Sequence, residues 1–250
     1  MSTSSWQITA SLAYAEFKRS VKRPSFYVIW AGFTFIAMLS FWYYYYAFHQ
    51  NLTSLTVGDY LIHPSFYTLH FVFLFLAPLL AMDSLAKEQS QRTMVLLLMS
   101  PLSHGQIVLA KLAARVGQVV ILLIPTLIFP LATMLMGWKG GLPLLAHYIA
   151  LFFTVTIYLM LGMMISSFTR HQLLAAVGTI LLLVFFMILA AQAFHFSSLA
   201  WARSIRYLTM FYHFEIVSRG LLEATDIVYF ASAIGIPFYV TVKSMDRRWW

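Results

Sequence analysis

Six long apolar stretches without a charged side chain dominate this sequence. A helix needs roughly 20 apolar residues to cross a hydrocarbon core about 30 Å thick, and five of the stretches meet or approach that length. None of the 16 basic and 8 acidic side chains lies inside them. The stretches are 25–48, 64–82, 116–136, 143–168, 172–193 and 227–242. We expect the short last one to recruit Leu221 and Leu222 or to thin the bilayer locally.

The composition points to the same environment. Hydrophobic residues make up 61% of the 250 residues and charged residues only 10%, whereas soluble domains are roughly 45–50% apolar and 25% charged. Such a chain has too few polar side chains to cover a surface exposed to water. The sequence therefore predicts an all-α integral membrane protein with six transmembrane helices, for which the lipid bilayer is the solvent.

Several classes of function are disfavoured by what the sequence lacks. Proton relays and ion-coupled pumps usually place an acidic group within the membrane, and here no acid lies in the apolar stretches. There is no cysteine, and no P-loop, H-E-x-x-H or G-x-S-x-G motif occurs. We therefore expect that the chain is not an enzyme and has no catalytic residue, cofactor or metal site of its own. We attribute the net charge of +8 to loops that set membrane topology, and not to nucleic-acid binding.

Basic side chains are divided unevenly between the two ends of the expected helices, with twelve at one end and four at the other. The four are Lys139, Arg203, Arg206 and Arg219. Short loops rich in Lys and Arg stay in the cytoplasm. We therefore expect the N- and C-termini to be cytoplasmic.

Residues 1–23 have the pattern of an amphipathic helix that lies in the membrane interface. Lys18, Arg19 and Lys22 lie opposite an apolar face, and Pro24 separates this helix from the first span. The apolar face consists of Trp6, Ala10, Ala13, Tyr14, Phe17 and Val21.

The connection 83–115 is charged at its ends and apolar at 94–99, a core too short to cross the membrane. Ser103 followed by Gln106 predicts a capping box that starts the next helix. We also expect i,i+4 ion pairs from Asp83 to Lys87 and from Glu88 to Arg92. On physical grounds alone, the apolar core has two equal alternatives: it lies on the membrane surface, or it docks into a partner protein.

Residues 194–226 are too aromatic for a solvated loop and too charged for a span. They predict short interfacial or re-entrant helices on the outer side. The candidate functional side chains of this segment are Arg203, Arg206, His213, Glu215 and Arg219.

Residues 88–111 resemble the cytoplasmic loop of ABC-2 type transporter permeases. Arg92 stands where that family prefers Gly, and Val95 where it prefers Glu. The segments 24–29, 166–172, 213–222 and 226–230 resemble, in the same order, those of the gliding-motility-associated subgroup. The matching residues of the loop are Thr93, Leu96, Leu97, Ser100, Pro101, Ile107 and Lys111.

The resemblance implies the type V exporter-like permease fold: an elbow helix at 1–23, followed by a six-helix domain at 24–250. Such a chain is the membrane half of a bacterial inner-membrane ABC transporter, usually an exporter. It works as a dimer with a second copy or a paralogue, and two separately encoded ATPase subunits bind ATP and Mg²⁺. Outer re-entrant helices would lie in 194–226. The implied contacts of the coupling loop with the ATPase are Glu88, Arg92, Thr93, Met94, Leu97, Ser100, Pro101 and Ser103.

A second interpretation keeps the same fold but assigns it another task. In this alternative the chain is a mechanotransmission or scaffold subunit that acts on an auxiliary membrane or periplasmic subunit and transports no substrate. The aromatic and charged segment 194–226 is compatible with either interpretation.

Overall fold

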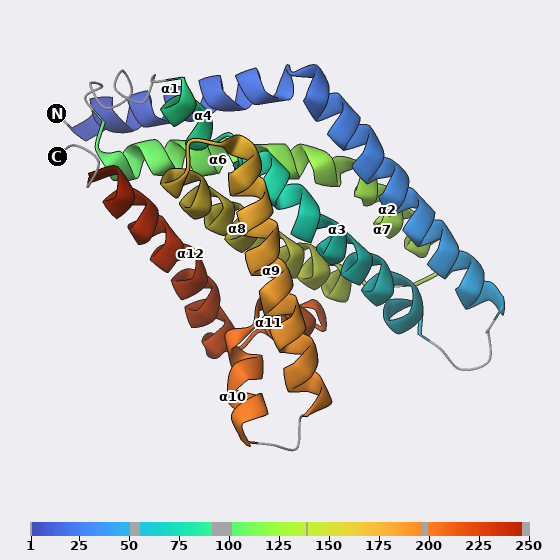
Figure 1. Ribbon diagram of the computed structural model, residues 1–250. Coiled ribbons are helices and arrows are strands. Elements are labelled where there is room, and N and C mark those ends of the chain that lie inside the picture. Colours follow the sequence, from blue (N-terminus) through green and yellow to red (C-terminus); the bar gives the residue numbers. More distant parts are fainter. Residues whose placement is uncertain (1, 51–55, 92–101, 139, 197–199, 247–250) are drawn as a thin grey trace.

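A computed structural model of the chain describes all residues except 1, 51–55, 92–101, 139, 197–199 and 247–250 (Figure 1). The regular secondary structure of the described residues is entirely helical. The helices are α1 (Ser2–Val21), α2 (Pro24–Gln50), η1 (Gly58–Ile62), α3 (His63–Ala81), α4 (Ala86–Ser90), α6 (His104–Leu123), η2 (Ile124–Leu127), α7 (Ile128–Leu135), α8 (Gly141–Phe168), α9 (Gln172–His195), α10 (Ala200–Leu208), α11 (Met210–Ser218) and α12 (Ala224–Asp246).

Six helical segments of the described chain are long and apolar enough to cross a membrane, which confirms the expected number. They are Pro24–Gln50, Gly58–Ser90, His104–Leu135, Gly141–Phe168, Gln172–His195 and Ala224–Asp246. The chain is therefore an all-α, multi-pass membrane protein.

The expected lengthening of the last span through Leu221 and Leu222 is wrong. Both leucines precede the helix and are exposed. Gly220, with a φ of 84°, follows the end of α11 in the left-handed conformation, and α12 begins only at Ala224. The helix instead gains length at its C-terminal end, where it continues to Asp246.

The two ends of the bundle differ in what they carry (Figure 1). Both described chain ends lie at one end of the bundle, together with α1 and α4. We call this the terminal end. The opposite end, where α2 and α9 finish and α10 lies, is called the distal end.

Helix α8 forms the centre of the bundle and packs against α3, α9, α11 and α12. Its Tyr158 is fully buried, as are Phe66 and Phe73 on α3. Gly162 allows α3 to approach closely, because a Cβ atom at this position would lie 2.7 Å from the Cβ atom of Ala81. The core is thus built between α8 and α3, two of the helices that the hydropathy pattern predicts.

We expect Gly162→Ala to lower the free energy of unfolding by about 1 kcal/mol, because overpacking outweighs the better helix propensity of alanine. The control Gly235→Ala on α12 meets no atom within 4 Å and is expected to stabilise by up to about 1 kcal/mol. Apparent melting temperatures in one detergent measure both changes. Equal shifts for the two variants would contradict the close approach at Gly162.

Helix α1 forms separately from the first span, as expected, and lies along α6 (Figure 1). The face that it packs coincides only in part with the predicted apolar face. Trp6 and Tyr14 are exposed, whereas Thr9 and Ser20 are buried, and the ring of Phe17 lies against Gly117. The packed face is rotated because α6 presents basic side chains to α1, and these attract its polar side. Trp6 and Tyr14 remain available to the membrane interface.

Candidate functional site

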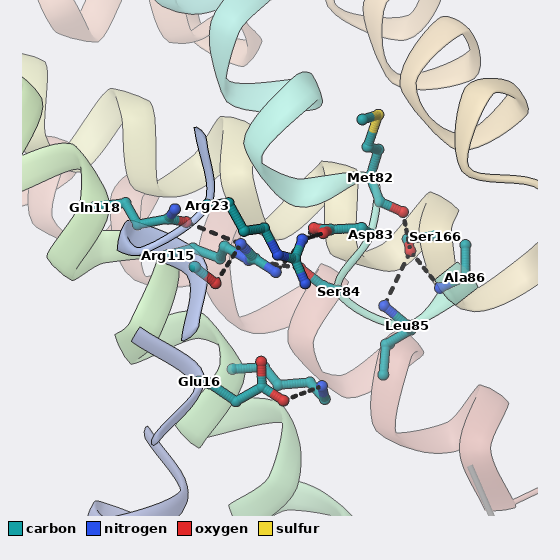
Figure 2. A network of polar contacts seen from close by, with 12 residues as sticks. Glu16, Arg23, Met82, Asp83, Ser84, Leu85, Ala86, Arg115, Gln118 and Ser166 are labelled. Carbon is teal, nitrogen blue, oxygen red and sulfur yellow. Dashed lines mark hydrogen bonds and ion pairs between the residues drawn. The ribbon is translucent and has the colours of Figure 1, made fainter. Parts of the chain in front are cut away.

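The terminal end contains a buried network of charged side chains centred on Arg115 of α6 (Figure 2). The guanidinium donates to Asp83 Oδ1 at 2.9 Å, and Arg23 also forms an ion pair with this carboxylate. Arg115 further donates to the Ser84 hydroxyl at 3.1 Å. Its remaining bonds go to Ser20 Oγ at 3.2 Å and Gln118 Oε1 at 2.9 Å. One arginine therefore connects α1, the turn after α3, and α6.

Lys111, one helical turn before Arg115, forms a second bridge. Its Nζ lies 3.3 Å from Glu16 Oε1 of α1 and 2.6 Å from Glu88 Oε1 of α4. The lysine side chain is only 3% exposed. A buried charge is tolerated when it is paired and hydrogen-bonded, so this lysine fixes the relative positions of α1, α4 and α6.

The turn between α3 and α4 is fixed from the other side by Ser166 of α8 (Figure 2). Its hydroxyl accepts from the backbone N–H of Leu85 at 3.2 Å and of Ala86 at 2.9 Å, and donates to the Met82 carbonyl at 3.0 Å. One donor and two acceptors are the full capacity of a serine hydroxyl. Gln89 Nε2 adds a bond to the Ser167 carbonyl at 3.0 Å. Helix α4 is therefore attached to the central helix α8.

The start of α6 confirms the capping box predicted from the sequence. Ser103 Oγ accepts from the Gln106 N–H at 3.3 Å, and Gln106 Oε1 accepts from the Ser103 N–H at 3.0 Å. Helix α4 ends at Ser90, before residues 92–101, and Ser103 follows them. The segment 92–101 thus begins and ends next to anchored structure.

The ion pair expected from Asp83 to Lys87 is wrong. Asp83 lies in the turn between α3 and α4, so the helical i,i+4 geometry does not exist there, and its carboxylate pairs with Arg23 and Arg115. Glu88 pairs with Lys111. The expected contact from Glu88 to Arg92 lies outside the described residues. The same holds for five further predicted site residues: Thr93, Met94, Leu97, Ser100 and Pro101.

A cavity of about 700 Å³ adjoins this network, between α1, α4 and α6. Its wall includes Arg19, Arg23, Lys87 and Glu16, and it also contains Leu102, close to the end of the segment 92–101. Charged side chains of both signs therefore line this cavity.

The distal segment 194–226 forms two short helices, α10 and α11, neither of which is long enough to span a membrane. The predicted short helices are therefore present, and their interfacial or re-entrant position stays a prediction. Arg203 belongs to α10, and its side chain lies outside the described residues. Glu215 and Arg219 form an exposed ion pair at 2.9 Å.

His213 forms a buried polar contact that joins the elements of the distal segment. Its Nδ1 lies 2.6 Å from Asp226 Oδ1, and its Nε2 lies 2.9 Å from the Tyr207 carbonyl. The imidazole stacks on Tyr229 with the ring centroids 3.8 Å apart. His213 and Asp226 are 2% and 1% exposed. Asp226 Oδ2 also accepts from the Glu223 N–H at 2.9 Å, so this pair attaches α11 to the start of α12.

Arg206 of α10 lies over the ring of Tyr212, with its Cζ atom 4.7 Å from the ring centroid. Burial and the hydrogen bond with Tyr207 raise the pKa of Tyr212. Its hydroxyl therefore stays protonated at neutral pH, and the ring remains an uncharged platform for the guanidinium.

The sequence-based reasoning missed the principal members of both polar sites. Arg23 and Arg115 belong to the twelve bases from which the sequence predicts topology, Asp226 enters only through the resemblance of 226–230, and Glu16 has no predicted role. A usable signal existed: four of the eight acids lie near the many bases of the terminal end, and partially buried bases there need partners. The described residues contain no group of three His, Cys, Asp or Glu side chains that could hold a metal ion.

Comparison with known proteins places these features in a family. The family model described as "ABC-2 family transporter protein" matches residues 10–236. A comparison with curated proteins found no match.

Proposed function

Because the chain belongs to the ABC-2 family of transporter proteins, we propose that it is the permease subunit of an ABC exporter driven by a separately encoded ATPase. The observation that carries this proposal is the buried network beside the segment 92–101. Three anchors hold its borders: Lys111 on Glu88, the Ser103 cap, and Ser166 on the turn before α4. A short segment between fixed helices suits a coupling helix that receives force from a partner.

The network offers a route for that force. Movement of 92–101 would pull on α4 and on the start of α6, which are joined to each other by Glu88 and Lys111. A displacement of α4 would move α8 through the hydrogen bonds of Ser166. A displacement of α6 would move α1 through the contacts that Glu16 and Arg115 make between these two helices. Rigid ion pairs transmit displacement, so the six-helix half moves as a body against a second copy or a paralogue.

In this proposal the terminal end faces the cytoplasm of a bacterium and the chain lies in its inner membrane. The excess of basic side chains at the terminal end supports this orientation. The partner ATPase binds ATP with Mg²⁺. The elbow helix α1 lies in the inner interface, with Trp6 and Tyr14 exposed to headgroups.

The test is co-expression with the genomically neighbouring ATPase, purification in mild detergent, and an ATP hydrolysis assay. We expect equal stoichiometry for the wild type, and for Leu97→Glu at least a tenfold loss of captured ATPase, because a buried unpaired carboxylate would weaken the contact. The control Gln7→Glu places the same group on the exposed face of α1 and should bind normally.

Two outcomes would count against the proposal. A wild-type chain that purifies alone, without any nucleotide-hydrolysing partner, excludes the ABC assembly. Wild-type capture by Leu97→Glu refutes only the contact assigned to the segment 92–101. If the complex forms but its hydrolysis responds only to an auxiliary subunit at the distal end, the mechanotransmission alternative is favoured.

A further inference from the structure

A cavity of about 440 Å³ lies at the distal end, lined by residues of α9, α10, α11 and the first half of α3. Its volume is within the range of roughly 300–1,000 Å³ that is typical of pockets for small molecules. Most of its wall is apolar or aromatic, with Met187, Phe194 and Phe211 among the lining residues. Ala190 and Ala191 keep the α9 side of the cavity open.

The polar part of the wall has an uneven charge balance. The carboxylate of Glu215 is already engaged by Arg219. Arg206, which also lines the cavity, takes part in no ion pair among the described residues, and its Nε is buried without a hydrogen-bond partner. In native proteins such an atom commonly marks the place of a water, an ion or a ligand.

The position of Arg206 suits the capture of an anion. Its guanidinium is held over the ring of Tyr212, which orients the plane of the donors. A planar guanidinium recognises phosphate and carboxylate oxygens through parallel hydrogen bonds, and it is more weakly hydrated than an ammonium group. A guanidinium held on Tyr212, without an ion pair among the described residues and beside a largely apolar cavity, favours a ligand with one anionic head and an apolar body.

We propose that this distal cavity binds an anionic amphiphile: a phosphate or carboxylate head on Arg206, with an apolar chain along the walls formed by α9 and α11. A divalent metal is disfavoured because the wall offers only His195 and an engaged carboxylate as ligands. The further step, that this ligand is a molecule that the permease transports, rests on the proposed function.

The test is a titration of the purified chain in neutral maltoside detergent with dodecyl phosphate, followed by native mass spectrometry. We expect saturable binding of one equivalent, and Arg206→Gln should weaken it at least tenfold, which corresponds to about 1.4 kcal/mol. The matched control Arg170→Gln removes an exposed arginine that does not line the cavity and should leave binding unchanged. Inorganic phosphate, which is the head without the chain, should not bind.

A second variant separates binding from folding. Ala191→Trp fills the cavity while it leaves Arg206 in place, so it should also abolish binding. Its melting temperature should stay close to that of the wild type, because Ala191 is exposed.

A competition experiment identifies the source of the ligand. Displacement of dodecyl phosphate by phosphatidylglycerol would indicate a bilayer phospholipid, and lack of displacement would indicate a single-chain ligand. Both results support the site.

The inference is overturned by unsaturable binding, by inorganic phosphate binding as well as dodecyl phosphate, or by equal affinity of the two arginine variants. These results are independent of the ATPase partnership, since the titration uses the chain alone. A chain that binds the amphiphile but captures no ATPase refutes the proposed function and keeps the site. The converse result refutes only the site.

Discussion

Replacing Arg115 with methionine is expected to lower the apparent melting temperature of the detergent-solubilised protein by roughly 6–12 °C. Removing one member of a buried ionic network costs about 3–5 kcal/mol, and we expect the lower end because Arg23 still pairs with Asp83. For a chain of this size each kcal/mol shifts the melting temperature by roughly 2–4 °C. The Ser84, Ser20 and Gln118 side chains would also lose the donor that they share.

Two further variants test whether stability depends on the planar set of guanidinium donors or only on the positive charge of Arg115. Arg115→Lys keeps the charge, but a lysine cannot reproduce the planar fork that serves four acceptors, so we expect an intermediate loss. Lys22→Met removes an exposed cation near the end of α1 and should change the melting temperature by less than about 1 °C, because exposed charges contribute little. If Arg115→Met behaves like Lys22→Met, the network is not structural.

The same arginine should matter for coupling. Because Arg115 joins α1 to the turn before α4, Arg115→Lys is expected to keep the captured ATPase but to reduce its stimulation. The readout is the ratio of ATP hydrolysis to bound ATPase in the complex. An unchanged ratio would show that force does not pass through this side chain, and it would leave the stability prediction intact.

The second large effect is expected at the distal end, where His213→Leu should destabilise the protein by about 3–5 kcal/mol. The substitution leaves the Asp226 carboxylate 1% exposed with only the Glu223 N–H as a hydrogen-bond donor, and a buried charge without its partner is strongly unfavourable. Asp226→Leu should cost less, about 1–3 kcal/mol, because a buried imidazole nitrogen then loses its hydrogen-bond partner.

A double-mutant cycle separates the pair from its surroundings. The double variant His213→Leu with Asp226→Leu is expected to recover part of the loss, because no buried charge remains. The exposed pair Glu215 and Arg219 provides the control, and its removal should cost only about 0.3–0.5 kcal/mol. Strictly additive losses in the buried cycle would refute a direct interaction between His213 and Asp226.

Much of the fold could be predicted because it depends on local properties of the chain. The six spans follow from uninterrupted apolar stretches, and the separate helix α1 follows from Pro24. The cap at Ser103 follows from a four-residue pattern. Each of these features is decided by residues that are close in sequence and by the cost of exposing polar groups to lipid.

The sites were predicted less well, for a definite reason. The i,i+4 spacing that predicts an ion pair between Asp83 and Lys87 assumes a continuous helix. The chain instead turns between α3 and α4. Of the predicted residues of the distal segment, His213 acquires its role from Asp226, which lies on another helix. Arg206 acquires its role from a cavity between four helices.

By itself, the sequence determined that the chain crosses the membrane six times, which segments stay outside the spans, and where its charges cannot lie. Only the tertiary structure decided which polar groups meet. Lys111 and its partner Glu16 are 95 residues apart in the sequence, and Ser166 accepts a hydrogen bond from the Leu85 amide, 81 residues away. Hydropathy is a property of each segment alone, whereas an ion pair depends on the rotation and crossing of two helices. Those are set by close packing, such as that of α8 against α3 at Gly162.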